Sequence, residues 1–141
     1  MRRMADAALD DVGVLVTRPR TQAAELVAAI ERAGGTAFCF PVIEISALDE
    51  SVVTAAAAKL PAPDVVVFVS RNAVEYGISF TGSGKIAVIG PATAAAVKAA
   101  GHIVDIQPAS GLDSEHLLTE PDLQDVAGTH VRLLLGGEGR E

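Results

Sequence analysis

One segment of the sequence decides the fold: VVVFVSRNAVEYGI, residues 65–78. Its first five residues are apolar without interruption, which is typical of a strand buried on both faces of a sheet. A serine follows at once, and residues 72–78 have the pattern of a short helix. A buried strand that leads directly into a helix is the unit from which parallel α/β sheets are built.

The same alternation continues on both sides of this segment. The sequence predicts strands at residues 12–16, 36–40, 64–69, 85–89, 102–106 and 129–135. It predicts helices at residues 23–33, 49–60, 72–78, 92–100, 114–118 and 122–126. We therefore expect an α/β fold in which helices cover both faces of a parallel sheet, as in a flavodoxin-like lobe.

Residues 42–46 form a further extended apolar piece directly after Pro41. They follow the strand at residues 36–40 so closely that no crossover helix fits between the two. We interpret residues 42–46 as a connector that leaves one lobe for another. The last predicted strand has no covering helix after it, so we expect the final lobe to be incomplete at Glu141.

Composition limits the classes of protein that the chain can represent. It has 141 residues, of which 50% are hydrophobic and 21% charged, enough to bury a core in one domain or two small lobes. The net charge of −7 disfavours general binding to nucleic acid or to an anionic membrane. No apolar run approaches the roughly 20 residues of a membrane span, and no signal-peptide core follows the start. A single cysteine, Cys39, permits no internal disulfide and fits the cytoplasm.

Polar residues follow four of the predicted strands, where ligands bind in open α/β sheets. The four loops are Thr17-Arg18-Pro19, Ser70-Arg71-Asn72, Gly90-Pro91-Ala92-Thr93 and Gly136 to Arg140. Hydroxyls, arginines and free amides at helix starts suit a carboxylate or phosphate ligand. Serine, threonine and asparagine at such positions are also ordinary helix N-caps, and both interpretations remain open.

Other chemistry has little support in the sequence. Gly84-Lys85 is followed by Ile86 and so lacks the hydroxyl of a P-loop, and Gly137-Glu138-Gly139 is only a fragment of a nucleotide-binding pattern. The three histidines lie in separate elements without metal-ligand spacing, so we expect no metal site. No residue stands out as a catalytic acid, base or nucleophile, and the catalytic residue is unknown at this stage.

Several motifs, taken in order, resemble the uroporphyrinogen-III synthase family. They are Val14-Leu15-Val16-Thr17-Arg18-Pro19, Phe40-Pro41-Val42-Ile43-Glu44-Ile45, Val67-Phe68-Val69-Ser70-Arg71-Asn72, Ile86-Ala87-Val88-Ile89-Gly90-Pro91-Ala92-Thr93, Gly111-Leu112-Asp113-Ser114-Glu115, and Leu133 to Glu141. Each motif is loose by itself, and their order over nearly the whole chain makes the match specific.

The resemblance implies two α/β lobes joined by a two-stranded connector, with the active site between them. Residues 1–40 would open the first lobe, residues 41–46 would form one connector strand, and residues 47–141 would form most of the second lobe. The family continues beyond this length, and the tyrosine thought to assist departure of the hydroxyl lies in that later part. Tyr76 does not occupy its position, so we expect the 141-residue chain to be inactive or weak.

The implied activity is that of a lyase of heme biosynthesis, which cyclises hydroxymethylbilane to uroporphyrinogen III and inverts ring D. The resemblance implies no metal or organic cofactor, a small-molecule partner, and a monomer at full length. The residues it assigns to substrate binding are Thr17, Arg18, Ser70, Arg71, Asn72, Gly90, Ala92, Thr93 and, more weakly, Ser114. The alternatives are a non-catalytic anion-binding α/β module, and a nucleotide-dependent enzyme built on residues 136–139.

Overall fold

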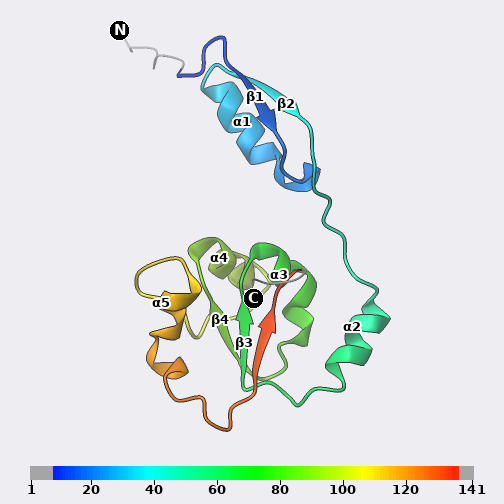
Figure 1. The fold of residues 1–141 in the computed structure, drawn as a ribbon, viewed down its shortest axis with the longest axis vertical. Coiled ribbons are helices and arrows are strands. Elements are labelled where there is room, and N and C mark those ends of the chain that lie inside the picture. The colour runs from blue at the N-terminus through cyan, green and yellow to red at the C-terminus, as the bar shows by residue number, and fades with distance from the viewer. Residues whose placement is uncertain (1–7, 137–141) are drawn as a thin grey trace. The chain divides into compact units, whose positions relative to one another are not determined.

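The computed structural model describes residues 8–136, and the chain divides into two compact units, Met1–Ala47 and Leu48–Glu141 (Figure 1). The first unit contains β1 (Gly13–Val16), a 3₁₀ turn (Arg20–Gln22), α1 (Ala24–Arg32) and β2 (Thr36–Cys39). The second contains α2 (Glu50–Ala57), β3 (Val65–Phe68), α3 (Arg71–Gly77), a 3₁₀ turn (Ile78–Phe80), β4 (Lys85–Val88), α4 (Pro91–Ala99), α5 (Ser114–Leu118), a 3₁₀ turn (Pro121–Leu123) and β5 (Val131–Leu134).

The first unit is a single β–α–β unit. β1 and β2 pair in parallel, and α1 covers one face of the pair, where Val16, Ala23 and Ile30 are buried together. Gly34 ends the helix with φ of +87°, a left-handed conformation that glycine adopts without a steric cost. On the other face, Leu15 and Phe38 lie opposite each other and are 61% and 57% exposed.

Residues 41–46, which we expected as a connector strand, belong to no sheet in this structure. The amide of Val42 donates to the Thr17 carbonyl at 3.2 Å, and beyond it the segment runs as irregular chain. A strand needs a neighbour to accept and donate its backbone hydrogen bonds, and beyond Val42 no described strand pairs with this segment.

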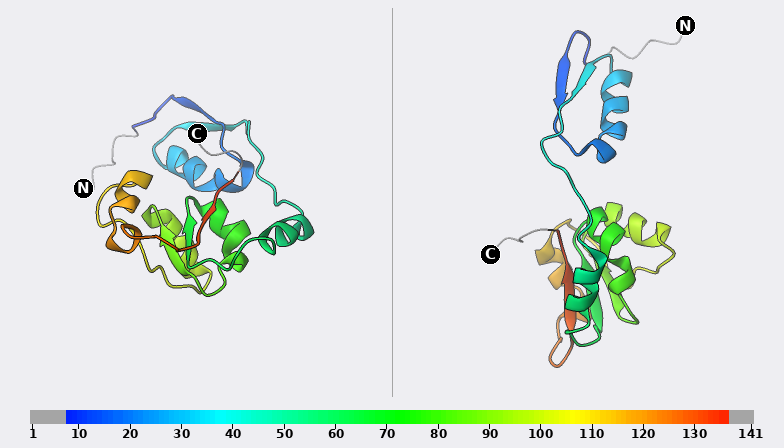
Figure 2. Two further views of the ribbon diagram at one scale, coloured as in Figure 1. Left: turned by 60° about the horizontal axis from the view of Figure 1, so that its bottom comes forward. Right: turned by 90° about the vertical axis from the view of Figure 1, so that its right-hand side faces the viewer.

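The second unit has the predicted architecture. Its sheet has the order β4-β3-β5 with both pairs parallel, and all four residues of the central strand β3 are buried. Val66 and Phe68 face the helices α3 and α4. Val65 and Val67 face the opposite side, where Leu117 of α5 and Leu123 pack against them. The right-hand view of Figure 2 shows α4 and α5 on opposite sides of the sheet.

Two predicted elements are reduced to a single bridge or a single turn. The strand predicted at residues 102–106 is reduced to one bridge, between Ala87 and Ile106. The Asp105 carboxylate accepts the Ile86 amide at 2.7 Å, which takes a donor that a continuous ladder would need. The helix predicted at residues 122–126 is one 3₁₀ turn at Pro121–Leu123, because Leu123 alone is buried there and the next residues have no core contact to stabilise further turns.

The core of the second unit predicts that two valines on neighbouring strands contribute differently to the free energy of unfolding. Val66 of β3 is fully buried, whereas Val131 of β5 is 46% exposed. Val66→Ala should lower the free energy of unfolding by about 2 kcal/mol, because it removes buried methyl groups and leaves a cavity. Val131→Ala should change it by less than about 0.5 kcal/mol. Urea unfolding followed by circular dichroism checks both, and equal effects would contradict the assignment of β3 as the core strand.

Candidate functional site

The parallel sheet of the second unit brings several predicted site residues to one edge. β3 and β4 run in the same direction, so the loops that begin at Ser70 and Gly90 leave the same, carboxyl edge. The parallel bridge at Ile106 places the start of the 107–113 loop there too, and Gly136 follows β5 at that edge. We call this set of loops the carboxyl edge. Thr17 and Arg18 are exposed at the carboxyl end of β1, in the first unit.

The first loop of the carboxyl edge is organised by a helix cap. Ser70 precedes α3, and its Oγ accepts the amide hydrogen of Ala73 at 3.1 Å. The N-cap interpretation is therefore correct for this hydroxyl, although its hydrogen can still be donated to a ligand. Arg71 is exposed beside it, and Asn72 is half-buried.

The second loop is open. Gly90 is the N-cap of α4 and has no side chain to cap the helix, and Pro91 has no amide hydrogen. The amides of Thr93 and Ala94 both donate to the Gly90 carbonyl, at 3.1 and 3.0 Å. Within residues 8–136, no partner is found for the amide of Ala92. A nine-residue helix thus begins at the carboxyl edge with an uncapped, partially positive end.

Thr93, in the first turn of α4, is the unusual residue of this loop. It is only 6% exposed, yet its hydroxyl has no hydrogen-bond partner in the described part of the chain. The other buried threonine, Thr81, donates its hydroxyl to the Ile78 carbonyl at 2.8 Å. No described polar side-chain atom is both fully buried and unpaired, so the Thr93 hydroxyl must reach the surface. Together, Ala92 and Thr93 offer two unused donors to an anion.

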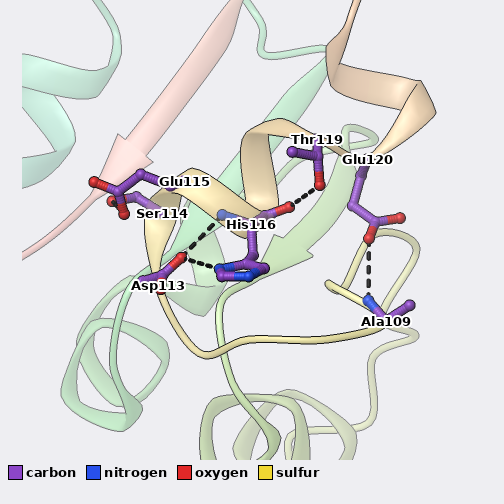
Figure 3. A network of polar contacts seen from close by, with 7 residues as sticks. All are labelled: Ala109, Asp113, Ser114, Glu115, His116, Thr119 and Glu120. Atoms are coloured by element: carbon purple, nitrogen blue, oxygen red, sulfur yellow. Dashed lines mark hydrogen bonds and ion pairs between the residues drawn. The ribbon is translucent and has the colours of Figure 1, made fainter.

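The third loop leads to α5, whose N-terminus already holds a carboxylate. Asp113 accepts the His116 amide at 2.9 Å and lies 2.5 Å from the His116 Nδ1 (Figure 3). These two hydrogen bonds hold the pKa of Asp113 below its usual range, and the bond from the His116 amide has the larger effect. Ser114 and Glu115 point away from His116, and the Ser114 Oγ lies 3.4 Å from a Glu115 oxygen. Ser114 is therefore a poorer anion ligand than the start of α4.

Sequence reasoning missed the pairing of His116 with Asp113 and treated all three histidines as isolated. The spacing of three residues between Asp113 and His116 is that of an N-cap and the amide it binds, and this could have predicted their contact. His130 likewise contacts Asp64, with 3.6 Å between Nδ1 and Oδ2, at the amino end of β3.

Three further expectations concern metals, membrane spans and the last loop. In the range 8–136, no group of three or more His, Cys, Asp or Glu side chains is placed to hold a metal ion. The same range contains no helix long and apolar enough to cross a membrane. Of the predicted loop from Gly136 to Arg140, only Gly136 is described, and Gly137-Glu138-Gly139 lies outside the described residues.

The sheet order and the helix layers on both faces define an α/β lobe of the flavodoxin-like kind. In proteins of this class, ligands generally bind beyond the carboxyl ends of the parallel strands. Comparison with known proteins narrows this class. A family model described as Uroporphyrinogen-III synthase HemD matches residues 24–141. The chain belongs to the uroporphyrinogen-III synthase family.

Three curated relatives agree with this assignment. The uroporphyrinogen-III synthases of Salmonella typhimurium and Escherichia coli are each 31% identical over an alignment of 139 residues, and each alignment covers 92% of this chain and 56% of the relative. A putative uroporphyrinogen-III synthase of Methanothermobacter thermautotrophicus is 37% identical over an alignment of 101 residues, which covers 66% of this chain and 40% of the relative. The chain thus spans about half the length of the curated relatives it matches.

The cap at α3 predicts how Ser70 contributes to stability. Ser70→Ala should lower the free energy of unfolding by about 1 kcal/mol, because the Ala73 amide loses its acceptor. Ser70→Asn should retain most of the stability, since an amide oxygen can cap the same amide. Thermal unfolding of both variants is the measurement, and Ser79→Ala, at an exposed position in the following 3₁₀ turn, is the control. An unchanged Ser70→Ala variant would show that the cap has no role.

Proposed function

We propose that this chain acts in the synthesis of uroporphyrinogen III and that the start of α4 binds carboxylate groups of a linear tetrapyrrole. The observation that carries the proposal is the pair of unused donors at Ala92 and Thr93, at the uncapped start of a nine-residue helix. Membership of the uroporphyrinogen-III synthase family supports the proposed reaction, and the donors at the start of α4 can bind the acidic side chains of its substrate.

The substrate of the proposed reaction, hydroxymethylbilane, carries acetate and propionate groups on every pyrrole ring. The chain itself has a net charge of −7, so long-range attraction does not favour binding. Backbone amides at a helix start act only over the first turn and are insensitive to the charge of distant residues. Arg71, exposed at the same edge, adds a local positive charge. An acidic protein can therefore hold a polyacid at this edge.

The proposed reaction consists of loss of water followed by rearrangement of carbon–carbon bonds. Departure of the hydroxyl as water leaves an electrophilic azafulvene, which the substituted carbon of ring D attacks to form a spiro intermediate. This intermediate fragments and recloses with ring D inverted, and a proton is lost as the aromatic pyrrole is restored. No net oxidation or reduction occurs, so the scheme calls for no redox cofactor.

Catalysis in this scheme is mainly a matter of orientation. The uncatalysed competitor closes the ring without inversion, so the protein must hold the chain of pyrroles in the geometry that inverts ring D. We propose that six residues of the second lobe bind carboxylates of the substrate: Ser70, Arg71, Asn72, Gly90, Ala92 and Thr93. We propose that Thr17 and Arg18 bind substrate carboxylates from the first lobe. Ser114 is the weakest member of this set, because Asp113 already occupies the start of α5. The residue that assists hydroxyl departure is unassigned.

We propose the lobe assignment implied by the family: residues 1–40 in the first lobe, 41–46 as a connector, and 47–141 in the second lobe. The division of the chain into units at Ala47 and Leu48 supports it. We further propose a cytoplasmic enzyme, monomeric at full length, that binds neither nucleic acid nor membranes. The charge of −7 disfavours binding to nucleic acid or to anionic membranes, and the single cysteine fits the cytoplasm.

The carboxylate site predicts a specific role for Thr93. Thr93→Ala should weaken binding of uroporphyrin, an oxidised form of the product, by about 1.5–3 kcal/mol, because a hydroxyl that donates to a charged group is lost. Thr93→Ser should retain most of the affinity. Isothermal titration calorimetry measures both, with Thr54→Ala on the exposed face of α2 as the control. Equal affinity of Thr93→Ala and the unaltered chain would remove Thr93 from the site.

The proposed activity is tested with freshly made hydroxymethylbilane and separation of the type I and type III isomers. We expect the 141-residue chain to give little type III product, because it spans 56% of its relatives and so supplies part of the substrate-orienting surface. Adding a second polypeptide that corresponds to the remainder of a relative should raise the type III fraction. Type III formation by the chain alone at a full-length enzyme's rate would contradict this expectation. Binding without any gain on addition would favour a non-catalytic anion-binding module.

A further inference from the structure

The first turn of α4 lacks the side-chain cap that the other helices at the carboxyl edge have. Gly90 is its N-cap residue, the position from which a side-chain oxygen can accept an amide hydrogen of the first turn. At the same edge, Ser70 provides such an oxygen for α3, and Asp113 provides one for α5. The missing cap needs a physical reason, because glycine is less favourable than serine or aspartate at this position.

The backbone does not require glycine at residue 90. Gly90 has φ of −140° and ψ of 166°, an extended conformation that any residue adopts. Ser70 has −156° and 164°, and Asp113 has −135° and 171°. A side chain on residue 90 would therefore leave the backbone in nearly the same direction, relative to its helix, as the two side chains that cap α3 and α5.

Packing does not require glycine there either. In the described part of the chain, one atom beyond the neighbouring residues lies within 4 Å of a Cβ added to Gly90: Leu112 Cδ2, at 3.8 Å. That separation is an ordinary van der Waals contact, and Leu112 is 71% exposed, so the contact adds no steric barrier. Gly84 shows the opposite case, because a Cβ there would lie 2.7 Å from the Pro63 carbonyl oxygen.

A capping side chain at residue 90 would occupy the donors of the first turn. N-cap oxygens accept from the second or third helical residue, which are Ala92 and Thr93 in α4. Within residues 8–136 the Ala92 amide has no partner, and the Thr93 amide donates to the Gly90 carbonyl at 3.1 Å. The Thr93 hydroxyl is also unpaired in that range, although the residue is only 6% exposed. A largely buried hydroxyl without a partner is unfavourable, and it independently indicates an acceptor supplied by a ligand.

We propose that Gly90 is a specificity-determining residue: its lack of a side chain leaves the Ala92 amide and the Thr93 hydroxyl to a carboxylate of the ligand, which then caps α4. A carboxylate has two oxygens that can accept from these two donors. It also carries the negative charge that a helix start stabilises. The inference rests on the proposed function of this site, and it adds the reason why the site is open.

This role makes stability and affinity change in opposite directions in Gly90→Asn, where a side-chain oxygen takes the amide that the ligand would use. The midpoint of thermal unfolding should rise by about 1–3 °C, because asparagine is a better N-cap than glycine. Uroporphyrin affinity, measured by isothermal titration calorimetry on the 141-residue chain, should fall about tenfold, because a hydrogen bond to a charged group is lost. Gly90→Asp should bind still more weakly, since its carboxylate also repels the ligand.

Gly90→Ala separates the missing cap from a simple need for space. Alanine adds a Cβ but no acceptor, so it should not raise the unfolding midpoint and should lower the affinity only about two- to three-fold. Equal losses of affinity in Gly90→Ala and Gly90→Asn would show that the ligand needs the space of a glycine, and the proposed role of the missing cap would be wrong. Unchanged affinity in Gly90→Asn would overturn it as well.

Gly128→Asn is the matched control, because it makes the same substitution away from the start of α4. Gly128 precedes β5, and no described atom lies within 4 Å of a Cβ added to it. Its φ of +75° is a conformation that asparagine tolerates. The affinity of this variant for uroporphyrin should equal that of the unaltered chain.

Amide proton resonances distinguish a failure of this inference from a failure of the proposed function. Without ligand, the Ala92 or Thr93 amide proton of Gly90→Asn should lie downfield of its position in Gly90→Ala, because it gains an acceptor. Equal positions would mean that no cap forms, which overturns the inference even if uroporphyrin binds.

If the unaltered chain does not bind uroporphyrin, the proposed substrate is wrong, and titration with sodium propionate decides the inference. A propionate-induced shift of the Ala92 amide in the unaltered chain that is absent from Gly90→Asn would support it. No shift in the unaltered chain would overturn it.

Discussion

The structure depends on the parallel burial of β3 between β4 and β5. Four consecutive residues of β3 are buried, with Val66 and Phe68 on one face and Val65 and Val67 on the other. Burying a side chain of this kind contributes about 1.5–3 kcal/mol, so the strand can be stable only with a helix layer on each face. Because the three strands run in parallel, every loop that leaves their carboxyl ends meets at one edge. The candidate site is a consequence of how the core is buried.

Three helices begin at this edge, and they differ in what occupies their first turn. The start of α3 is capped by Ser70, and the start of α5 is capped by Asp113. The start of α4 has glycine and proline where a cap would be, and its Thr93 hydroxyl is unused within residues 8–136. A local arrangement of this kind explains how a chain with net charge −7 can be suited to an acidic ligand, since helix-start donors act at short range. The difference in capping also ranks the candidate residues as anion ligands. The loop sequences alone could not rank them, because all of them carry similar polar residues.

The two units expose apolar surface in different ways. In the first unit, Leu15 and Phe38 lie on a sheet face that no described element of that unit covers. In the second, Val131 and Leu133 lie on the exposed side of β5. Contiguous exposed apolar surface usually marks a contact with further protein. The proposed lobe assignment fits both observations, because relatives of this chain are longer than the chain itself.

The sequence by itself determined the α/β class, the central strand, the loops of the carboxyl edge and the resemblance to uroporphyrinogen-III synthases. These follow from local patterns: an apolar run at residues 65–69, and polar residues at the point where each strand ends. Only the tertiary structure decided which donors are used. Whether Ser70 caps a helix, whether the Thr93 hydroxyl has a partner, and whether Asp105 interrupts a ladder depend on distances between atoms that the chain brings together when it folds.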